Sequence, residues 1–199
     1  MKKPAELDHP IHDLLAQRWS PVGFEPKPLP QAELCSCLEA ARWAASAFNE
    51  QPWTFLVAQR ENTAEFEKML SVLVEANQAW AKNASVLLLT CANQQFIRNS
   101  KPNTAALHDL GLAVGNLSVE ATARGLIVHQ MKGFLPDKAR EAYDVPEQIE
   151  LVTAIALGYA ADPETLPDDL KQRDLAERHR KPLAKFVFEG EWGHSADLG

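Results

Sequence analysis

The chain has 199 residues, 46% of them apolar, and a formal net charge of −7 at pH 7. This length and apolar content fit one domain with a substantial core, so we expect a single domain over residues 1–199. A negatively charged chain repels phosphate backbones, so we expect no nucleic-acid partner.

The apolar runs and the cysteines indicate where in the cell the protein is expected. The longest apolar run, residues 85–92, is far shorter than the roughly 20 residues that a membrane helix needs, so we expect no membrane partner. The first ten residues hold two lysines with no apolar segment behind them, which is unlike a secretory signal. Three cysteines cannot all pair with one another. We therefore expect a cytoplasmic protein with reduced thiols.

Hydrophobic spacing predicts helices that alternate with strands. Four prolines and a glycine exclude regular helix from residues 20–30. In chain order we expect a helix over 8–18, that irregular segment, a helix from about residue 31, a strand over 53–58, a helix over 62–80, a strand over 85–92, a helix over 104–124, a strand over 125–131, a helix over 136–143, a strand over 150–158 and an acidic surface loop over 161–172. Long, mostly helical connections between strands predict a three-layer α/β/α or α+β arrangement around a mixed sheet.

One face of the helix predicted over residues 104–124 carries small residues, among them Gly111 and Gly115. Each glycine inside a helix costs about 1 kcal/mol relative to alanine, so this face needs a close neighbour. Tight packing inside the monomer, a helix–helix contact between subunits and contact with a flat cofactor are all open interpretations.

Amide side chains follow the second helix, in the loop that leads to Trp53. Asn49 and Gln51 each present a carbonyl and an NH₂ group, which can pair with the edge of a heterocycle. The alternative is that Asn49 caps the loop and Gln51 faces water.

Basic residues near the two ends of the chain are candidates for a phosphate site. Arg18 and Ser20 lie near the start, and residues 178–181 are rich in arginine and lysine. Arginine binds phosphate oxygens bidentately, and a serine hydroxyl adds a donor. A solvated charged surface is the alternative. Gly133, just after a predicted strand, lets backbone approach a ligand and is equally well explained as a turn glycine.

Several other chemistries lack their motifs. The sequence contains no Gly-x-Gly-x-x-Gly, no Walker loop and no Gly-x-Ser-x-Gly. Cys35 and Cys37 have no second ligand pair at zinc-site distance and point in different directions on a helix, so we expect no metal. His108 and Asp109 are adjacent on a helix and are not expected to face each other. We therefore expect no catalytic acid–base pair.

Taken together, the segments resemble the nitroreductase family of FMN-dependent enzymes. The most specific match is Asn49-x-Gln51-Pro-Trp53, inside residues 45–55. The other matches follow in family order: Arg18-x-Ser20 with Phe24, Asp109-x-Gly111, Asn116-Leu117, Gly125-Leu126, Lys132-Gly133-Phe134, Gly158-Tyr159 and Arg178-x-Arg180 through Leu183. They span residues 18 to 183, which is nearly the whole chain.

The resemblance implies a fold, a partner and an activity. The fold would be nitroreductase-like, with a mainly antiparallel sheet and an intertwined homodimer that binds FMN between subunits, and a C-terminal arm over about 184–199 would reach the partner. The activity would be hydride transfer from NADH or NADPH through flavin N5 to nitroaromatic, quinone or similar acceptors, with ping-pong kinetics. The flavin supplies this chemistry, so no side chain is implied as catalytic.

The resemblance also implies cofactor-binding residues in four groups. The phosphate group comprises Arg18, Trp19, Ser20, Arg178, Arg180 and Lys181. Asn49 and Gln51 would lie near the flavin or its ribityl chain, and Ala45, Ser46 and Ala47 would reach the flavin of the other subunit. The turn Gln130, Met131, Lys132 and Gly133 would approach N5 with its backbone.

Three positions depart from the family pattern, and other functions stay open. Val22 stands where the family has a basic residue, Ala45 where it has proline, and Lys132 where an acidic residue is frequent; a cation at Lys132 is expected to raise the flavin's reduction potential. Residues 93–104 are expected to shape the substrate entrance. The alternatives are a same-fold enzyme with another acceptor (flavin destructase or dehalogenase type), a non-catalytic FMN-binding or sensing protein, and a structural domain without cofactor.

Overall fold

The computed structural model describes residue 3 and residues 5–198. Their strands form one five-stranded sheet. The strands are β1 (Phe24–Glu25), β2 (Trp53–Gln59), β3 (Val86–Asn93), β4 (Ile127–Met131) and β5 (Ile149–Ala160). β3 lies between β2 and β5, and both β1 and β4 pair with β5. Every one of these pairings is antiparallel, which confirms the expected α+β class and its mainly antiparallel sheet. The described strands include no parallel pair, so the expectation of a mixed sheet is wrong.

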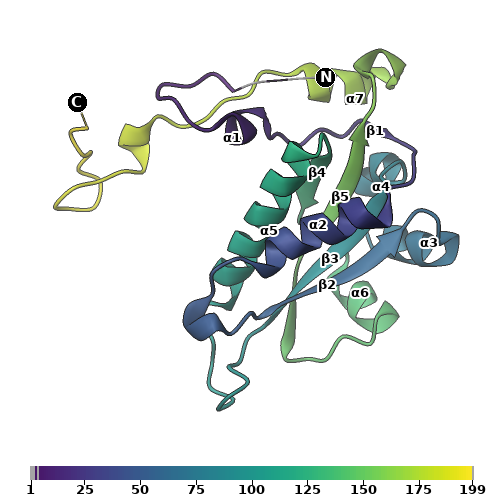
Figure 1. The fold of residues 1–199 in the computed structure, drawn as a ribbon, viewed down its shortest axis with the longest axis horizontal. Helices are drawn as coiled ribbons and strands as arrows, with labels where there is room; N and C mark the ends of the chain where they lie inside the picture. Colours follow the sequence, from purple (N-terminus) through teal and green to yellow (C-terminus); the bar gives the residue numbers. More distant parts are fainter. Residues whose placement is uncertain (1–2, 4, 199) are drawn as a thin grey trace.

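Helices cover both faces of the sheet (Figure 1). They are α1 (Asp13–Gln17), α2 (Gln31–Arg42), α3 (Thr63–Ser71), α4 (Glu75–Ala81), α5 (Ala106–Ala123), α6 (Pro136–Ala142) and α7 (Asp168–Leu175), with short 3₁₀ turns at Ala47–Asn49, Pro163–Thr165 and Leu183–Lys185. α2 and α5 cover one face, and α3, α4 and α6 cover the other, so three layers are present (Figure 1). No helix in the described part of the chain has the length and apolarity needed to cross a membrane.

The central strand β3 explains why the core has two halves. Leu87 and Leu89 join the cluster on the α3–α4 side, and Val86 and Leu88 join the cluster under α2 and α5. Successive strand side chains point to opposite faces, so a strand with both faces covered is apolar throughout. The strand expected over residues 85–92 is confirmed for this reason.

The single helix expected over residues 62–80 is wrong, because the segment forms two helices. The helical structure is interrupted between α3 and α4, where Val72 and Leu73 are buried. Leu135 donates its N–H to the Val72 carbonyl at 2.8 Å, and Leu73 forms a β-bridge with Phe134. Pairing with a segment distant in sequence thus overrides the helical spacing.

The acidic loop expected over residues 161–172 is also wrong. It contains a 3₁₀ turn and most of α7. Asp168 and Asp169 lie in the first turn of α7, where acidic side chains complement the helix dipole. Leu170 and Asp174, four residues apart, are its buried residues and share one face. Acidic composition here reflects a helix start as well as solvent exposure.

The start of the chain also differs from expectation. Only Asp13–Gln17 of the helix expected over 8–18 is helical, with the His12 side chain accepting from the Leu14 N–H at its start. Pro10 disfavours helical backbone at the residue before it. Residues 20–30 contain no helix, as expected, and the short strand β1 lies within them. The helix expected from about residue 31 begins at Gln31 and ends at Arg42.

Helix α5 exposes both of its glycines. Leu110 and Leu117 are buried in the cluster under α2 and α5, whereas Leu107 is 48% exposed. Apart from the neighbouring backbone of α5 itself, a Cβ added at Gly111 or Gly115 would meet nothing within 4 Å in the described part of the chain. Tight packing inside the monomer is therefore the wrong explanation for these glycines.

Strand register places the two ends of the sheet far apart. Trp53 pairs with Ala92 and Ala92 with Glu150 at one end, whereas Phe24 pairs with Ala160 at the other. Ten residue steps of β5 at about 3.3 Å each separate Glu150 from Ala160, which gives about 33 Å. The loop that precedes Trp53 and the segment that precedes Phe24 therefore lie at opposite ends of the molecule, as Figure 1 shows.

Candidate cofactor site

Residues from both ends of the chain line one small hollow of about 270 Å³. Arg18, Trp19 and Ser20 contribute from the N-terminal side, and Arg178 and Arg180 from the C-terminal side. The Nη1 atom of Arg18 donates a hydrogen bond of 3.2 Å to the Ser20 Oγ. The structure thus brings together the phosphate-binding residues expected from the two ends, apart from Lys181.

The arginines of this hollow repel one another. Burial lowers the pKa of Arg18, and the charges of Arg178 and Arg180 lower it further. Burial and then the charge of Arg180 lower the pKa of Arg178. Among the described residues, no ion pair neutralises any of the three; Glu177, also at the hollow, lies 3.4 Å from the ring of His179. Clustered guanidinium groups that form no salt bridge fit a bound phosphate, which accepts bidentate hydrogen bonds from arginine.

Arg178 also ties the two chain ends together. Its guanidinium donates to the carbonyl of Ala16 at 2.9 Å and to that of Arg18 at 2.8 Å, and also to the carbonyl of Lys3. These bonds occupy much of its donor capacity. Arg18 and Arg180 are therefore better placed than Arg178 to donate to a ligand.

Lys181 lies beside this hollow, in a larger apolar trough of about 840 Å³ that also reaches Arg18 and Arg180. Exposed Leu15, Leu183 and Phe186 line the same trough. Residues from both chain ends line this trough. Its apolar lining suits a covering protein segment better than a charged group.

Val22 is turned away from the hollow. It is 3% exposed and belongs to the core cluster on the α3–α4 side. The family's second basic residue therefore has no charged replacement at this position. Lys3 lines the hollow, but its ammonium donates to the main-chain oxygens of Asp174 and Ala176.

The loop that carries Asn49 and Gln51 lies at the other end of α5. Phe48, Asn49 and Gln51 all have positive φ, between 53° and 56°, which is strained for residues with side chains. The Ser46 Oγ accepts the Gln51 N–H at 3.0 Å, and the Gln51 amide donates to the Asn49 carbonyl at 3.1 Å. Ala45, Asn49 and Gln51 are exposed. One chain does not bring this loop and the arginine hollow together.

Asp109 anchors that loop, a role the sequence did not indicate. Its side chain is almost fully buried, and its Oδ2 accepts the Ala47 N–H at 3.0 Å. The ring of His108 lies 3.4 Å from the other carboxylate oxygen, so the expectation that these neighbours do not face each other is wrong. His108 itself is largely exposed, and Asp109 is committed to the loop.

Residues 93–104 lie against the same loop. The rings of Phe48 and Phe96 are 5.8 Å apart, and the Arg98 guanidinium lies 4.1 Å from the centre of the Phe48 ring. Glu50 accepts the Ile97 N–H at 2.5 Å. The segment expected to shape the substrate entrance is therefore fixed to the loop that carries Asn49.

The turn after β4 packs on α4. A Cβ at Gly133 would lie 2.4 Å from the Asn77 Nδ2, which donates to the Gly133 carbonyl at 2.9 Å. Close approach to α4 therefore explains this glycine within the monomer. Met131 is buried, Gln130 is exposed, and the ammonium of Lys132 donates to the Val152 carbonyl at 3.1 Å.

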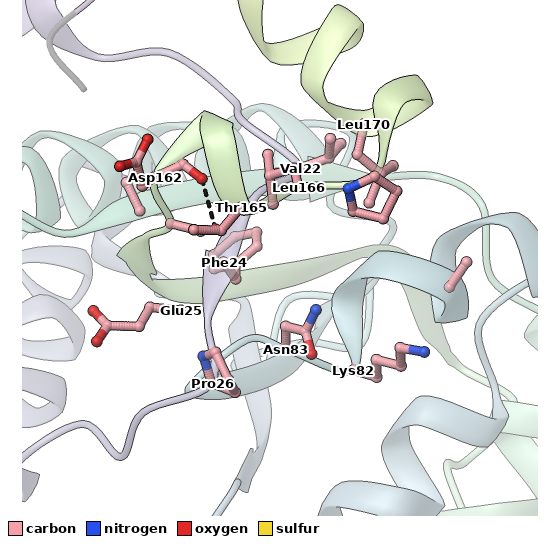
Figure 2. Close-up of a pocket in the computed structure, with 14 residues that line it drawn as sticks. Val22, Phe24, Glu25, Pro26, Lys82, Asn83, Asp162, Thr165, Leu166 and Leu170 are labelled. Atoms are coloured by element: carbon pink, nitrogen blue, oxygen red, sulfur yellow. Dashed lines mark hydrogen bonds between the residues drawn. The ribbon is translucent and has the colours of Figure 1, made fainter.

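A separate cavity of about 650 Å³ lies between β1, the end of α4 and the segment that enters α7. Figure 2 shows its apolar floor, including Phe24 and Leu166, and its polar rim. The lining carries one cation, Lys82, and two carboxylates, Glu25 and Asp162, which repel a phosphate group. The arginine hollow is the better candidate for an anion for this reason.

Comparison with known proteins agrees with the fold. A model described as the Nitroreductase family matches residues 15–159. A crystal structure described as an oxidoreductase containing FMN is 34% identical, covers 96% of this chain and 97% of its own, and has a TM-score of 0.89. An uncharacterized 15.4 kDa protein of Mycolicibacterium smegmatis is 33% identical over 125 residues, which are 63% of this chain and 83% of that one.

A further relative covers almost the whole chain. A Methanothermobacter thermautotrophicus protein named putative NADH dehydrogenase/NAD(P)H nitroreductase is 26% identical over 192 residues, which are 92% of this chain and 91% of the relative. The family match covers most of the chain and includes Arg18, Ser20 and the Asn49 loop. The chain therefore belongs to the Nitroreductase family.

Proposed function

We propose that this chain is an FMN-dependent oxidoreductase that takes hydride from NADH or NADPH and reduces nitroaromatic, quinone or similar acceptors. The supporting observation is the hollow in which Arg18, Ser20 and Arg180 converge, where neither arginine forms a salt bridge within the described part of the chain. The names of relatives agree: one solved structure contains FMN, and another relative is named an NAD(P)H nitroreductase.

The protein's own part is to bind and orient. Arg18, Ser20 and Arg180 would hold the FMN phosphate, with Arg178, Lys181 and Trp19 beside them. The backbone of residues 130–133 would lie against the ring. FMN, when bound, would supply the redox chemistry, with N5 of its ring as the reacting atom. Donor and acceptor would use the same face of the site in turn, so ping-pong kinetics are expected.

The activity needs a homodimer in this proposal. The loop over residues 45–51 precedes Trp53 at one end of the sheet, and Arg18 and Ser20 precede Phe24 at the other end, about 33 Å away along β5. Two copies that pack antiparallel along α5 would bring the loop of one to the hollow of the other. The exposed α5 face, with Leu107, Gly111, Leu112 and Gly115, gives such a contact room to approach closely.

The C-terminal arm supports the same assembly. Phe186 is 57% exposed and Trp192 is 95% exposed, so this arm buries little apolar surface against its own domain. Exposed aromatic side chains of this kind are typical of interfaces. The arm extends away from the domain in Figure 1, and we propose that it contacts the partner subunit; residue 199, at its end, lies outside the described residues. A cytoplasmic location is also part of the proposal. It agrees with the three cysteines, Cys35, Cys37 and Cys91, which are all free.

The decisive experiment is an absorbance spectrum of purified protein incubated with FMN, followed by anaerobic addition of NADH and then of NADPH. A protein-bound flavin band that bleaches supports the proposal and identifies the donor. A band that persists with both donors favours a binding or sensing role instead. Absence of any bound flavin contradicts the proposal. Steady-state assays with a nitroaromatic and a quinone then separate the acceptor classes.

A further inference from the structure

The residues that would bind phosphate lie on a segment without regular structure. Between the end of α1 and the start of β1, Arg18 and Ser20 lie in neither helix nor strand. Backbone groups in such a segment still need hydrogen-bond partners, and those partners fix its path. The position of the Arg18 and Ser20 donors therefore depends on what holds the residues around them.

Asp174, a residue of α7, holds the end of this segment. Its Oδ1 accepts the Val22 N–H at 2.8 Å, and its Oδ2 accepts the Gly23 N–H at 2.9 Å. The residue is 4% exposed, and among the described residues its carboxylate forms no salt bridge. A buried carboxylate is costly unless it is hydrogen-bonded, so these two charge-assisted bonds define its place.

Gly23 lets the carboxylate come this close. A Cβ at position 23 would lie 2.8 Å from the Asp174 Oδ2 and 2.5 Å from the Leu166 Cδ1. The backbone of Gly23 is not in the left-handed region, so space rather than conformation requires the glycine. The segment and α7 therefore fit each other closely at this point.

The chain that leaves α7 holds the start of the same segment. Arg178 follows Asp174 by four residues and donates to the carbonyls of Ala16 and Arg18. Arg180, two residues further, brings its own guanidinium to the hollow. One continuous stretch, from Asp174 to Arg180, thus supplies Arg180 to the hollow and, through Arg178, fixes the position of Arg18.

We propose that Asp174 is the positioning residue for the phosphate-binding part of the site, and that it gives the protein its preference for phosphorylated FMN over riboflavin. This inference rests on the proposed function. Asp174 does not touch the ligand; it sets the distance between the donors of Arg18 and Ser20 and those of Arg180. Riboflavin has the same ring and ribityl chain without the phosphate, so it does not report on this distance.

The test is Asp174→Asn, with dissociation constants of FMN and riboflavin measured by fluorescence titration of flavin-free protein. Asparagine keeps the shape but has one acceptor oxygen, and its NH₂ would face a backbone donor. We expect the dissociation constant for FMN to rise about tenfold or more and that for riboflavin to change by less than about twofold. An equal change for both flavins, or no change for either, overturns the proposal.

Two further variants complete the design. Asp169→Asn, an exposed position on the same helix, is the matched control and should leave both constants unchanged. Gly23→Ala disturbs the same contact from the other side and should give the same FMN-specific loss. If Asp174→Asn does not fold, Gly23→Ala decides, and wild-type affinities for both flavins in that variant overturn the proposal. Failure of the wild-type protein to bind FMN is a different result, which contradicts the proposed function itself.

Discussion

The guanidinium of Arg18 donates to the hydroxyl of Ser20 at 3.2 Å while lying within the repulsive field of Arg178 and Arg180. The flavin-free protein therefore holds three like charges close together in a partly buried place. A bound phosphate would relieve this repulsion and accept the remaining arginine donors. Affinity for the ligand and stability of the empty site thus oppose each other at this position.

Replacement of Arg18 by glutamine tests that opposition. Arg18→Gln should weaken FMN binding about tenfold or more, because a charge-assisted hydrogen bond is lost. The flavin-free variant should melt at the same temperature as wild type or higher, since the repulsion is reduced. Titration calorimetry and thermal melts measure both effects. Lys101→Gln, an exposed cation distant in sequence, is the control; a loss of stability with unchanged FMN affinity would contradict this reading.

Strong periodicity allowed much of the fold to be predicted. β3 and α5 were expected close to their observed bounds, because a continuous apolar run and a repeated 3-4 spacing have few alternative structures. The break between α3 and α4 was missed, since it depends on backbone bonds from residues 133–135, which no local pattern records. α7 was missed because its acidic first turn resembles an exposed loop in composition.

The residues of the candidate site were also predicted only in part. Arg18, Ser20 and Arg180 were identified from residue type, and the fold brings them to one hollow. Asp174 could not be identified, because it is one acid in an acidic stretch and its partners lie more than 150 residues away. The role of Asp109 could not be predicted either, because its partner, the Ala47 N–H, is known only from the fold.

Loss of the Asp109 carboxylate should release the loop that carries Asn49. Asp109→Ala leaves the partly buried Ala47 N–H without its acceptor, which should cost about 1–3 kcal/mol in the free energy of unfolding. Urea denaturation measures this loss. Asp137→Ala removes an exposed acid from the first turn of α6 and controls for the helix-dipole contribution. Equal losses in both variants would show that the Ala47 contact contributes nothing.

A substitution on the exposed glycine face of α5 tests whether this face forms the proposed dimer interface. Gly115→Leu adds a side chain where the single chain has open space, so the monomer should tolerate it and gain helix propensity of about 1 kcal/mol. A partner helix packed on this face would clash with the new side chain. We expect wild-type protein to sediment as a dimer and Gly115→Leu to shift towards monomer.

Gln172→Leu, an exposed apolar addition on α7, is the control for this experiment and should remain dimeric. The dimer proposal fails if the wild-type chain is monomeric with FMN bound. A dimer that survives Gly115→Leu unchanged would place the interface on another surface.

His129 should make stability depend on pH. Its Nδ1 donates to the Pro21 carbonyl at 2.8 Å, its ring lies 4.6 Å from that of Trp80, and burial lowers its pKa below the ordinary 6.5. Above that pH the ring is neutral in both folded and unfolded chains and has no effect. As the pH falls below about 6.5, the unfolded chain takes up a proton that the folded chain does not, so stability falls until the folded-state pKa is reached.

His129→Gln removes this contribution, so its unfolding free energy should fall less than that of wild type between about pH 7 and pH 5. Urea denaturation at several pH values gives the comparison. His194→Gln, at an exposed position, should keep the wild-type slope. Since the Pro21 carbonyl belongs to the segment that carries Ser20, loss of FMN affinity should accompany the acid-induced loss in wild type. Parallel pH profiles for wild type and His129→Gln would show that another group is responsible.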